Sequence, residues 1–154
     1  MKRITFIRTG GMMVVTACCG STVLSGCKAI TGNSDTPPVP AGSFTVNGRN
    51  VRLELTRIPD LETEGGAVKF ESPDRDLKII VARTGPEEFA VVDDKCTHGG
   101  RELEYNHTTG EFRCVSFGHS KYNPEGHVVK GPAKGNLNAY KGYIEGDVDR
   151  KSVV

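Results

Sequence analysis

The 154 residues are enough for one hydrophobic core, and a hydrophobic content of 36% indicates neither two domains nor disorder throughout. The net charge is only +1, and the first 27 residues are basic with no acidic residue, so the rest of the chain is slightly acidic. This balance excludes the basic stripe that binds nucleic acid. The 19 glycines and 8 prolines indicate the many turns of an all-β fold.

Residues 1–27 are typical of an export signal, with a basic start, an apolar middle and a short terminal motif. The motif Leu24-Ser25-Gly26-Cys27 resembles the bacterial lipobox, whose cysteine is lipidated and anchors the protein to a membrane. We therefore expect Cys27 to hold the protein on the periplasmic side of a bacterial membrane. A transmembrane anchor is disfavoured because the apolar run is well short of the ~20 residues that span a bilayer. Ile4 stands where a twin-arginine signal has its second arginine, so the export route stays open.

Residues 28–43 shift to small and polar residues with three prolines. A segment of this composition cannot bury enough apolar surface to offset the entropy lost on ordering. We therefore expect a flexible tether, which lets an anchored domain move between two partners. An ordinary lipoprotein spacer is equally consistent with this composition.

Residues 44–154 are predicted to form the folded domain. Apolar and polar residues alternate along short segments separated by turn residues, which is typical of antiparallel strands. The expected strands lie at 44–46, 51–55, 68–70, 77–82, 89–92, 111–113, 126–129, 137–140 and 143–144. No amphipathic helix is indicated after residue 30. We therefore predict an all-β fold, a small antiparallel sandwich or barrel.

Two short segments carry metal-binding chemistry. The first is Cys96-Thr97-His98, and the second contains Cys114 and His119. One β-hairpin between them can bring both cysteines and both histidines to one point. Two thiolates and two imidazoles suit zinc or an iron-sulfur cluster far better than calcium or magnesium. No other cysteine lies beyond residue 27, so no structural disulfide competes for these thiols.

Each segment mixes one cysteine with one histidine, whereas short spacers in a structural zinc finger generally separate ligands of like kind. Mixed segments suit a two-iron cluster in which both thiolates bind one iron and both imidazoles bind the other. Residues 44–146 resemble the Rieske [2Fe-2S] family, whose pattern is Cys-x-His, a hairpin-length gap, Cys-x-x-His, Gly-Ser, an aromatic residue and a later Gly-Pro-Ala loop. The matching residues behind the candidate ligands are Ser120, Tyr122 and Gly131-Pro132-Ala133.

The resemblance implies a Rieske-like antiparallel β sandwich of two sheets, with a [2Fe-2S] cluster at the tip of a small subdomain. It implies that Cys96 and Cys114 bind the buried iron, and that His98 and His119 bind the outer one. The Gly131-Pro132-Ala133 loop is then expected to cover the cluster.

Two hydroxyl residues are implied to tune the cluster. Ser120 and Tyr122 are of the types that, in high-potential members, donate hydrogen bonds to a bridging sulfide and to a cysteine sulfur. Such bonds raise the reduction potential because they stabilise the more negative reduced state. We therefore expect an intermediate potential.

The second segment departs from the family pattern. Four residues separate Cys114 from His119 instead of two, and no glycine follows the histidine. A rebuilt loop can still place His119 at the iron, but an alternative is that Phe117 has displaced the ligand. The other imidazoles, His107 and His127, are expected on the surface and remain fallback ligands.

Three further positions distinguish this chain within the family. Arg101 and Ser116 stand at or near the positions where the respiratory branch has a disulfide, so the chain resembles the disulfide-free branch in this feature. Gly99 replaces a leucine that shields the histidines, which opens the outer edge to water or to a partner.

We expect one-electron transfer by a membrane-tethered subunit or partner of a respiratory-type oxidoreductase. The expected donor is a redox protein or a membrane quinol-oxidising complex, and the expected acceptor is a c-type cytochrome or a similar protein. Two alternatives are a ferredoxin-like component of an oxygenase system, which the lipobox opposes, and a structural zinc-binding module. No catalytic nucleophile or substrate pocket is indicated, so any enzyme activity would belong to a complex.

Overall fold

Short alternating segments form β-strands throughout the part of the chain that the computed structural model describes, which is residues 34–47, 50–147 and 150–153. The strands are β1 (Phe44–Asn47), β2 (Asn50–Glu54), β3 (Ala67–Ser72), β4 (Leu77–Arg83), β5 (Phe89–Asp93), β6 (Leu103–Asn106), β7 (Glu111–Cys114), β8 (Lys121–Tyr122), β9 (Val128–Lys130), β10 (Ala139–Lys141), β11 (Ile144–Asp147) and β12 (Arg150–Val153). The predicted export signal and Cys27 lie outside the described residues. Within them, no helix has the length and apolar character needed to cross a membrane.

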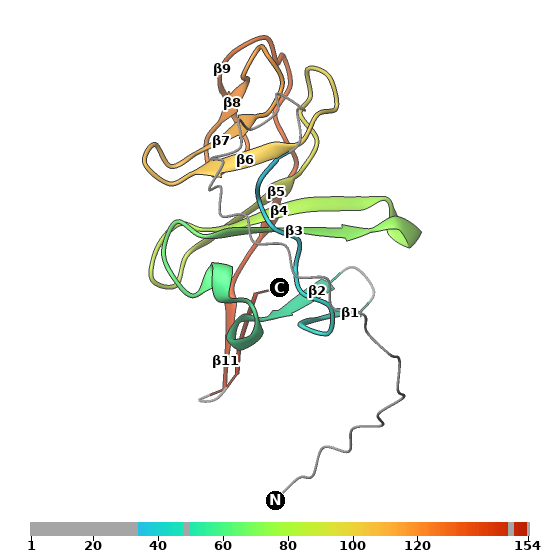
Figure 1. Cartoon of the computed structure of the whole chain (residues 1–154), viewed down its shortest axis with the longest axis vertical. Coiled ribbons are helices and arrows are strands. Elements are labelled where there is room, and N and C mark those ends of the chain that lie inside the picture. Colours follow the sequence, from blue (N-terminus) through green and yellow to red (C-terminus); the bar gives the residue numbers. More distant parts are fainter. Residues whose placement is uncertain (1–33, 48–49, 148–149, 154) are drawn as a thin grey trace, which may run out of the picture. The chain divides into compact units, whose positions relative to one another are not determined.

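The strands form three four-stranded sheets (Figure 1), in the orders β1-β2-β12-β11, β10-β5-β4-β3 and β6-β7-β8-β9. We call them the terminal, central and upper sheets. Every neighbouring pair in these sheets is antiparallel. The prediction of an all-β antiparallel fold is thus confirmed, and the two sheets implied by the family resemblance are joined by a third.

The predicted strand over residues 51–55 ends one residue early. Leu55 begins a 3-10 helix (Leu55–Arg57), and a second one (Pro59–Leu61) follows directly. Proline at the first position of the second helix has its φ already fixed and lacks an N–H that the helix would leave unpaired. The turn buries the side chains of Leu55 and Leu61 in the core. A third 3-10 helix (Pro73–Arg75) connects β3 to β4.

The central sheet divides the hydrophobic core into two clusters because successive side chains of a strand point to opposite faces. Ile80 and Ala82 of β4 pack in one cluster with Cys96 and Cys114. Ile79 and Val81, the intervening residues of the same strand, pack in the other cluster, which includes Leu53 of the terminal sheet. Both faces of the central sheet are therefore covered, and the two cysteines belong to the face that meets the upper sheet.

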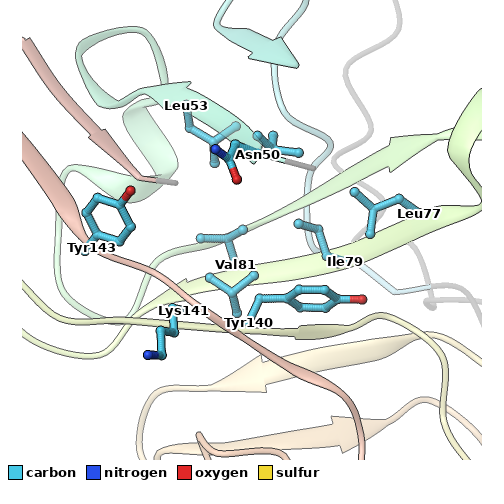
Figure 2. Close-up of a pocket in the computed structure, with 10 residues that line it drawn as sticks. Asn50, Leu53, Leu77, Ile79, Val81, Tyr140, Lys141 and Tyr143 are labelled. Atoms are coloured by element: carbon cyan, nitrogen blue, oxygen red, sulfur yellow. The ribbon is translucent and has the colours of Figure 1, made fainter. Parts of the chain in front are cut away.

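A pocket of about 280 Å³ lies on the opposite face of the central sheet from the cysteines. Figure 2 shows its lining, which includes Ile79 and Val81 of β4 together with Tyr140, Lys141 and Tyr143. None of its lining residues is a cysteine or histidine. The pocket therefore contains none of the predicted metal-binding residues.

Residues 34–43 belong to the predicted tether, and part of this segment packs against the domain. Pro38 forms a parallel bridge with Lys69 on the edge strand β3. The backbone N–H of Val39 donates to the Lys69 carbonyl (2.8 Å), and the Lys69 N–H donates to the Pro37 carbonyl (2.8 Å). A proline can take this place because it adds to the edge of a sheet, where one missing N–H is tolerated. The first part of the predicted tether, residues 28–33, lies outside the described residues.

Candidate metal centre

The first predicted segment is a tight loop after β5. The Cys96 N–H donates to the Arg101 carbonyl (2.8 Å), and the Gly100 N–H donates back to the Cys96 carbonyl (2.7 Å). Gly100 has a φ of +68°, a conformation that glycine adopts without the penalty of a Cβ. The loop buries Cys96 and leaves His98 exposed.

The second segment follows β7, which ends at the buried Cys114. The Cys114 N–H donates to the Ser120 carbonyl (2.8 Å), so residues 115–119 form a loop that returns to its starting point. Within it, the His119 N–H donates to the Ser116 carbonyl (3.0 Å) and closes a turn around Phe117 and Gly118.

The predicted covering loop lies against both segments. The Ala133 N–H donates to Oγ of Ser120 (3.1 Å) from the second segment, and Oγ1 of Thr97 from the first segment donates to the Gly135 carbonyl (2.6 Å). Gly131 has a φ of +102°, and a Cβ at this residue would lie 2.6 Å from Cα of Ser120. Only glycine allows this close approach.

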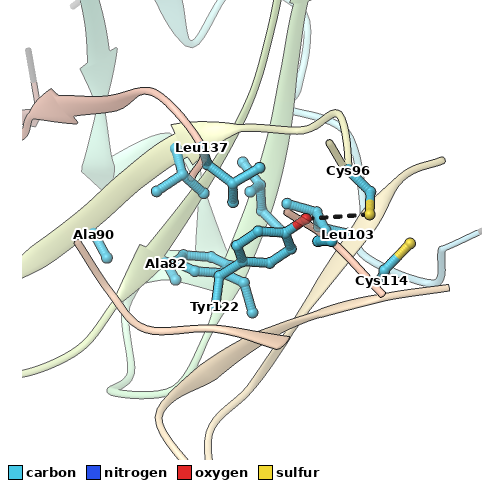
Figure 3. Packing of buried hydrophobic residues seen from close by; sticks show 11 residues of the cluster. Ala82, Ala90, Cys96, Leu103, Cys114, Tyr122 and Leu137 are labelled. Carbon is cyan, nitrogen blue, oxygen red and sulfur yellow. Dashed lines mark hydrogen bonds between the residues drawn. The ribbon is translucent and has the colours of Figure 1, made fainter. Parts of the chain in front are cut away.

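The thiols of Cys96 and Cys114 lie together beneath these loops (Figure 3). Both residues are buried, neither forms a disulfide, and their side chains are within hydrogen-bonding reach of each other. Oη of Tyr122 lies 3.2 Å from Sγ of Cys96, and Oγ of Ser116 lies 3.0 Å from Sγ of Cys114. Each sulfur thus has a hydroxyl group directed at it.

The two thiols differ in acidity. Burial disfavours the Cys96 thiolate, but hydrogen bonds from the Tyr122 hydroxyl, the His98 N–H and the Ser120 hydroxyl together hold the pKa of Cys96 below its usual value. Burial raises the pKa of Cys114, and the neighbouring Cys96 raises it further against the opposing hydrogen bond from Ser116. Cys96 is therefore the first of the pair to become a thiolate, the form that binds metal.

The histidines of the two segments are not buried with the thiols. His98 and His119 are exposed, and Nδ1 of His119 lies 3.3 Å from the carbonyl oxygen of its own segment's Cys114. Among the residues that the structure describes, no group of three or more His, Cys, Asp and Glu side chains is placed to hold a metal ion. The structure therefore brings Cys96 and Cys114 together but does not gather all four predicted ligands around one point.

The other candidate residues lie at defined places. His107 is in the turn between β6 and β7 and packs against Gly65, at the far end of the hairpin from Cys114. His127 is exposed in the turn before β9, and Phe117 is fully exposed. The turn thus directs the Phe117 side chain into solvent.

The structure adds two residues that the sequence did not identify as functional. Ser116 was noted only as a replacement for a cysteine, yet its hydroxyl contacts the Cys114 sulfur. The Thr97 N–H donates to Oη of Tyr122 (3.2 Å), and the Thr97 hydroxyl donates to the Gly135 carbonyl. Oγ1 of Thr97 also lies 3.1 Å from Oη of Tyr122, so the Tyr122 hydroxyl has two acceptors within reach, this oxygen and the Cys96 sulfur. The sequence signal was present in both cases, since each residue adjoins or nearly adjoins a predicted ligand.

A buried ion pair anchors the strand end that precedes Cys96. Nζ of Lys69 lies 2.9 Å from Oδ2 of Asp94 and 2.8 Å from Oε2 of Glu102. Oδ1 of Asp94 accepts a hydrogen bond from the Leu103 N–H (2.7 Å). Asp94 therefore joins β3, the first loop and β6.

This donor set fits one half of a Rieske-type cluster. In such a cluster two thiolates hold one iron and two imidazoles hold the other, so each iron takes only two protein ligands. The paired, buried, hydroxyl-bonded thiols suit the first iron, and hydrogen bonds to sulfur are among the features that set the potential of iron-sulfur sites.

Comparison with known proteins agrees with the site. The family model described as "Rieske [2Fe-2S] domain" matches residues 53–141. The iron-sulfur subunit 1 of the cytochrome b6-f complex from Synechocystis sp. is 38% identical over 55 residues, which are 36% of this chain and 30% of that protein. The chain thus matches less than a third of that relative's length.

A solved structure gives the same result for the fold. The plasma membrane Rieske protein PetC3 from Synechocystis PCC 6803 has a TM-score of 0.50 and 26% sequence identity, with 63% of this chain and 93% of that chain covered. Since the family model covers more than half of the chain, the predictions of the family and of the [2Fe-2S] cofactor are confirmed. This chain belongs to the Rieske [2Fe-2S] domain family.

Proposed function

We propose that this chain is a lipid-anchored one-electron carrier of the bacterial cell envelope. Cys96 and Cys114 bind one iron of the cluster, and His98 and His119 bind the other. The observation that carries this proposal is the buried thiol pair, in which each sulfur has its own hydroxyl donor at 3.0–3.2 Å. When bound, the cluster accepts and releases single electrons without an open coordination position.

The protein groups around the thiols favour the reduced state. Reduction adds negative charge to the sulfurs, and a hydroxyl that donates to a charged acceptor is stabilised more than one that donates to a neutral acceptor. Tyr122 and Ser116 supply one such donor to each cysteine. Burial of both cysteines excludes water, which strengthens these hydrogen bonds.

His119 is assigned to the outer iron because its side chain is held at the second segment. Its φ of +42° lies in the left-handed region, where a non-glycine residue is uncommon. The contact between Nδ1 and the Cys114 carbonyl oxygen keeps the ring beside that cysteine. His107 lacks this proximity, since β7 separates its turn from Cys114.

Membrane attachment is proposed through lipidated Cys27 at the end of the export signal. The relative in Synechocystis PCC 6803 is a plasma membrane Rieske protein, and the curated relative is a subunit of the cytochrome b6-f complex. Both support a membrane setting. We assign a membrane quinol-oxidising complex or another redox protein as the donor, and a c-type cytochrome or a similar protein as the acceptor.

The test starts from the purified full-length protein. We expect equal amounts of iron and acid-labile sulfide, a split visible spectrum, and a reduced-state EPR signal of a histidine-ligated cluster. A colourless protein that contains zinc and no acid-labile sulfide would contradict the proposal.

Histidine variants then test the ligand set. His98→Ala and His119→Ala should each abolish the EPR signal, whereas His107→Ala and His127→Ala serve as matched controls and should retain it. Cluster loss only in His107→Ala would overturn the assignment of His119.

The potential of the unsubstituted protein should fall as the pH rises, because iron-bound imidazoles lose protons in the oxidised state. A reduction potential that stays constant into strongly alkaline solution would argue against histidine ligation.

A further inference from the structure

The three loops around the thiols carry charge of one sign. Residues 95–101, 115–120 and 130–135 contain no aspartate or glutamate. Their exposed Lys and Arg residues are Lys95, Arg101, Lys130 and Lys134. None of these four forms an ion pair with any residue in the described part of the chain. The two acids that directly flank the first loop, Asp94 and Glu102, both pair with Lys69, and Glu102 also pairs with Lys78.

The loops meet in one surface. Thr97 of the first loop donates to the Gly135 carbonyl of the covering loop. A Cβ on Gly118 of the second loop would lie 2.8 Å from Cγ of Pro132 in the covering loop. The three loops that carry the four cations are therefore in contact with one another.

Phe117 adds an apolar group to this surface. Its side chain is 102% exposed, at the outer end of the turn closed by Ser116 and His119. This turn is the extra length of the second segment. A single exposed apolar residue is ordinary, but burial of a phenylalanine ring against a partner is favourable because it removes apolar surface from water. Its loop contacts the covering loop, which carries Lys130 and Lys134, so the ring is available as an anchor for a partner that these cations attract.

We propose that Phe117 and the four cations, which we call the tip surface, form the docking site for a redox protein whose electron-exchange face is acidic with an apolar centre. This inference rests on the proposed electron transfer. Cations without partners steer an oppositely charged protein toward the loops and raise its association rate. The Phe117 ring then holds the partner over the thiols and slows its dissociation. The extra length of the second segment is thereby given a role that the family resemblance leaves unexplained.

An anionic membrane is the other surface that attracts cations beside an aromatic ring. A protein partner is favoured because the loops of the tip surface enclose the redox site, which an electron acceptor must approach. A lipid surface accepts no electron, so the redox site gives a membrane no reason to bind at this place. Vesicles therefore enter the test as the competing outcome.

The experiment uses the full-length protein with its cluster, reduced by dithionite and mixed in a stopped-flow instrument with oxidised acidic plastocyanin. One electron leaves the reduced protein and converts Cu(II) of plastocyanin to Cu(I). We expect the second-order rate to fall as the ionic strength rises, since salt screens the attraction between exposed charges. Basic cytochrome c, whose haem iron goes from Fe(III) to Fe(II), should show the opposite dependence.

Variants identify the residues responsible. Lys95→Gln/Lys134→Gln should lower the rate toward plastocyanin about tenfold at low ionic strength and have little effect at high ionic strength. Phe117→Ala should raise the dissociation constant about tenfold. The matched controls are Lys141→Gln and Tyr143→Ala, which remove an exposed cation and an exposed aromatic ring from the far pocket, and both should leave these values unchanged.

The outcomes separate this inference from the proposed function. A missing EPR signal would count against the electron transfer itself. A normal signal with a rate that does not depend on ionic strength, or with equal losses in the control variants, would overturn only the docking site. Loss of binding to phosphatidylglycerol vesicles in the tip variants, with unchanged rates toward plastocyanin, would assign the tip surface to lipid and also overturn the inference.

Discussion

Oγ of Ser116 lies 3.0 Å from Sγ of Cys114, at a position where no disulfide is formed. A negatively charged Cys114 sulfur has no proton, so the Ser116 hydroxyl is the group that donates the hydrogen bond between the two. We predict that Ser116→Ala lowers the reduction potential, because the reduced state loses this stabilisation. A loss of about 1 kcal/mol for the hydrogen bond corresponds to about 40 mV for a one-electron couple. A redox titration followed by EPR measures this shift.

The control for this prediction is Ser116→Thr, which retains a hydroxyl at the same position. Its potential should stay near that of the unsubstituted protein. An unchanged potential in Ser116→Ala, with a normal EPR signal, would show that the hydroxyl does not donate to the bound thiolate.

Tyr122 holds an equivalent position at Cys96. Its hydroxyl accepts from the Thr97 N–H and lies 3.2 Å from the sulfur, within a ring that is completely buried. Tyr122→Phe should lower the potential by about as much as Ser116→Ala while retaining the packing of the ring. The shift in the double variant should differ from the sum of the two single shifts, because the two sulfurs are within hydrogen-bonding reach of each other. Shifts that add would indicate that the two donors act independently.

Gly131 is predicted to be essential for closing the covering loop. Alanine here would combine a φ of +102° with a Cβ only 2.6 Å from Cα of Ser120. Gly131→Ala should therefore destabilise the protein by about 3 kcal/mol and prevent cluster retention. Gly110→Ala is the matched control, since Gly110 has a φ of +66° but open space around its Cβ position. Its cost should be limited to about 1 kcal/mol of backbone strain. Equal losses in both variants, measured by chemical unfolding, would contradict the steric argument.

The alternation of apolar and polar residues was enough to predict the all-β fold and most strands of the central sheet. It predicts which residues share a face, but not how the faces of different sheets meet. β6 (Leu103–Asn106) was missed because its alternation covers only four residues, and its identity depends on pairing with β7. The end of β2 at Glu54 depends on burial of Leu55 in a turn, which is also a tertiary effect.

For the site, the hairpin-length gap between the two segments predicted that Cys96 and Cys114 come together, and the family resemblance implied the covering loop. Residue type and ligand spacing did not predict where the side chains of His98 and His119 lie. The extra length of the second segment allows several turn geometries, and the backbone of His119 adopts a left-handed conformation that its residue type does not favour. The ion pair of Lys69 with Asp94 joins residues far apart in the chain and has no local signature.

Tyr140 should titrate at unusually high pH. Its hydroxyl donates to Oδ1 of Asp93 (2.6 Å), and burial together with this carboxylate raises the pKa of Tyr140 to about 12. A tyrosine whose pKa is raised on folding stabilises the fold fully below its unfolded pKa of about 10, and this contribution is lost as the pH rises toward 12. The ultraviolet absorbance titration, taken as a difference from Tyr140→Phe, measures the shift. Asp93→Asn should lower the pKa of Tyr140; an unchanged titration in that variant would exclude the carboxylate as a cause.

Lys69 is predicted to be the most important single cation for the stability of the domain. It is the ion-pair partner of Oδ2 of Asp94, whose side chain has no exposed surface. Lys69→Met leaves this carboxylate buried and unpaired, which should cost about 3–5 kcal/mol in the free energy of unfolding. This loss of unfolding free energy should be smaller at low pH, because protonated Asp94 is neutral and does not need a cation. Burial raises the pKa of Asp94. The loss should therefore grow as the pH rises through that raised pKa. Lys78→Met is the matched control, because Lys78 also pairs with Glu102 (3.3 Å) but is 39% exposed, and it should cost less than about 1 kcal/mol. Urea unfolding of both variants across the acid range tests the argument, and equal, pH-independent losses would mean that Asp94 does not depend on Lys69.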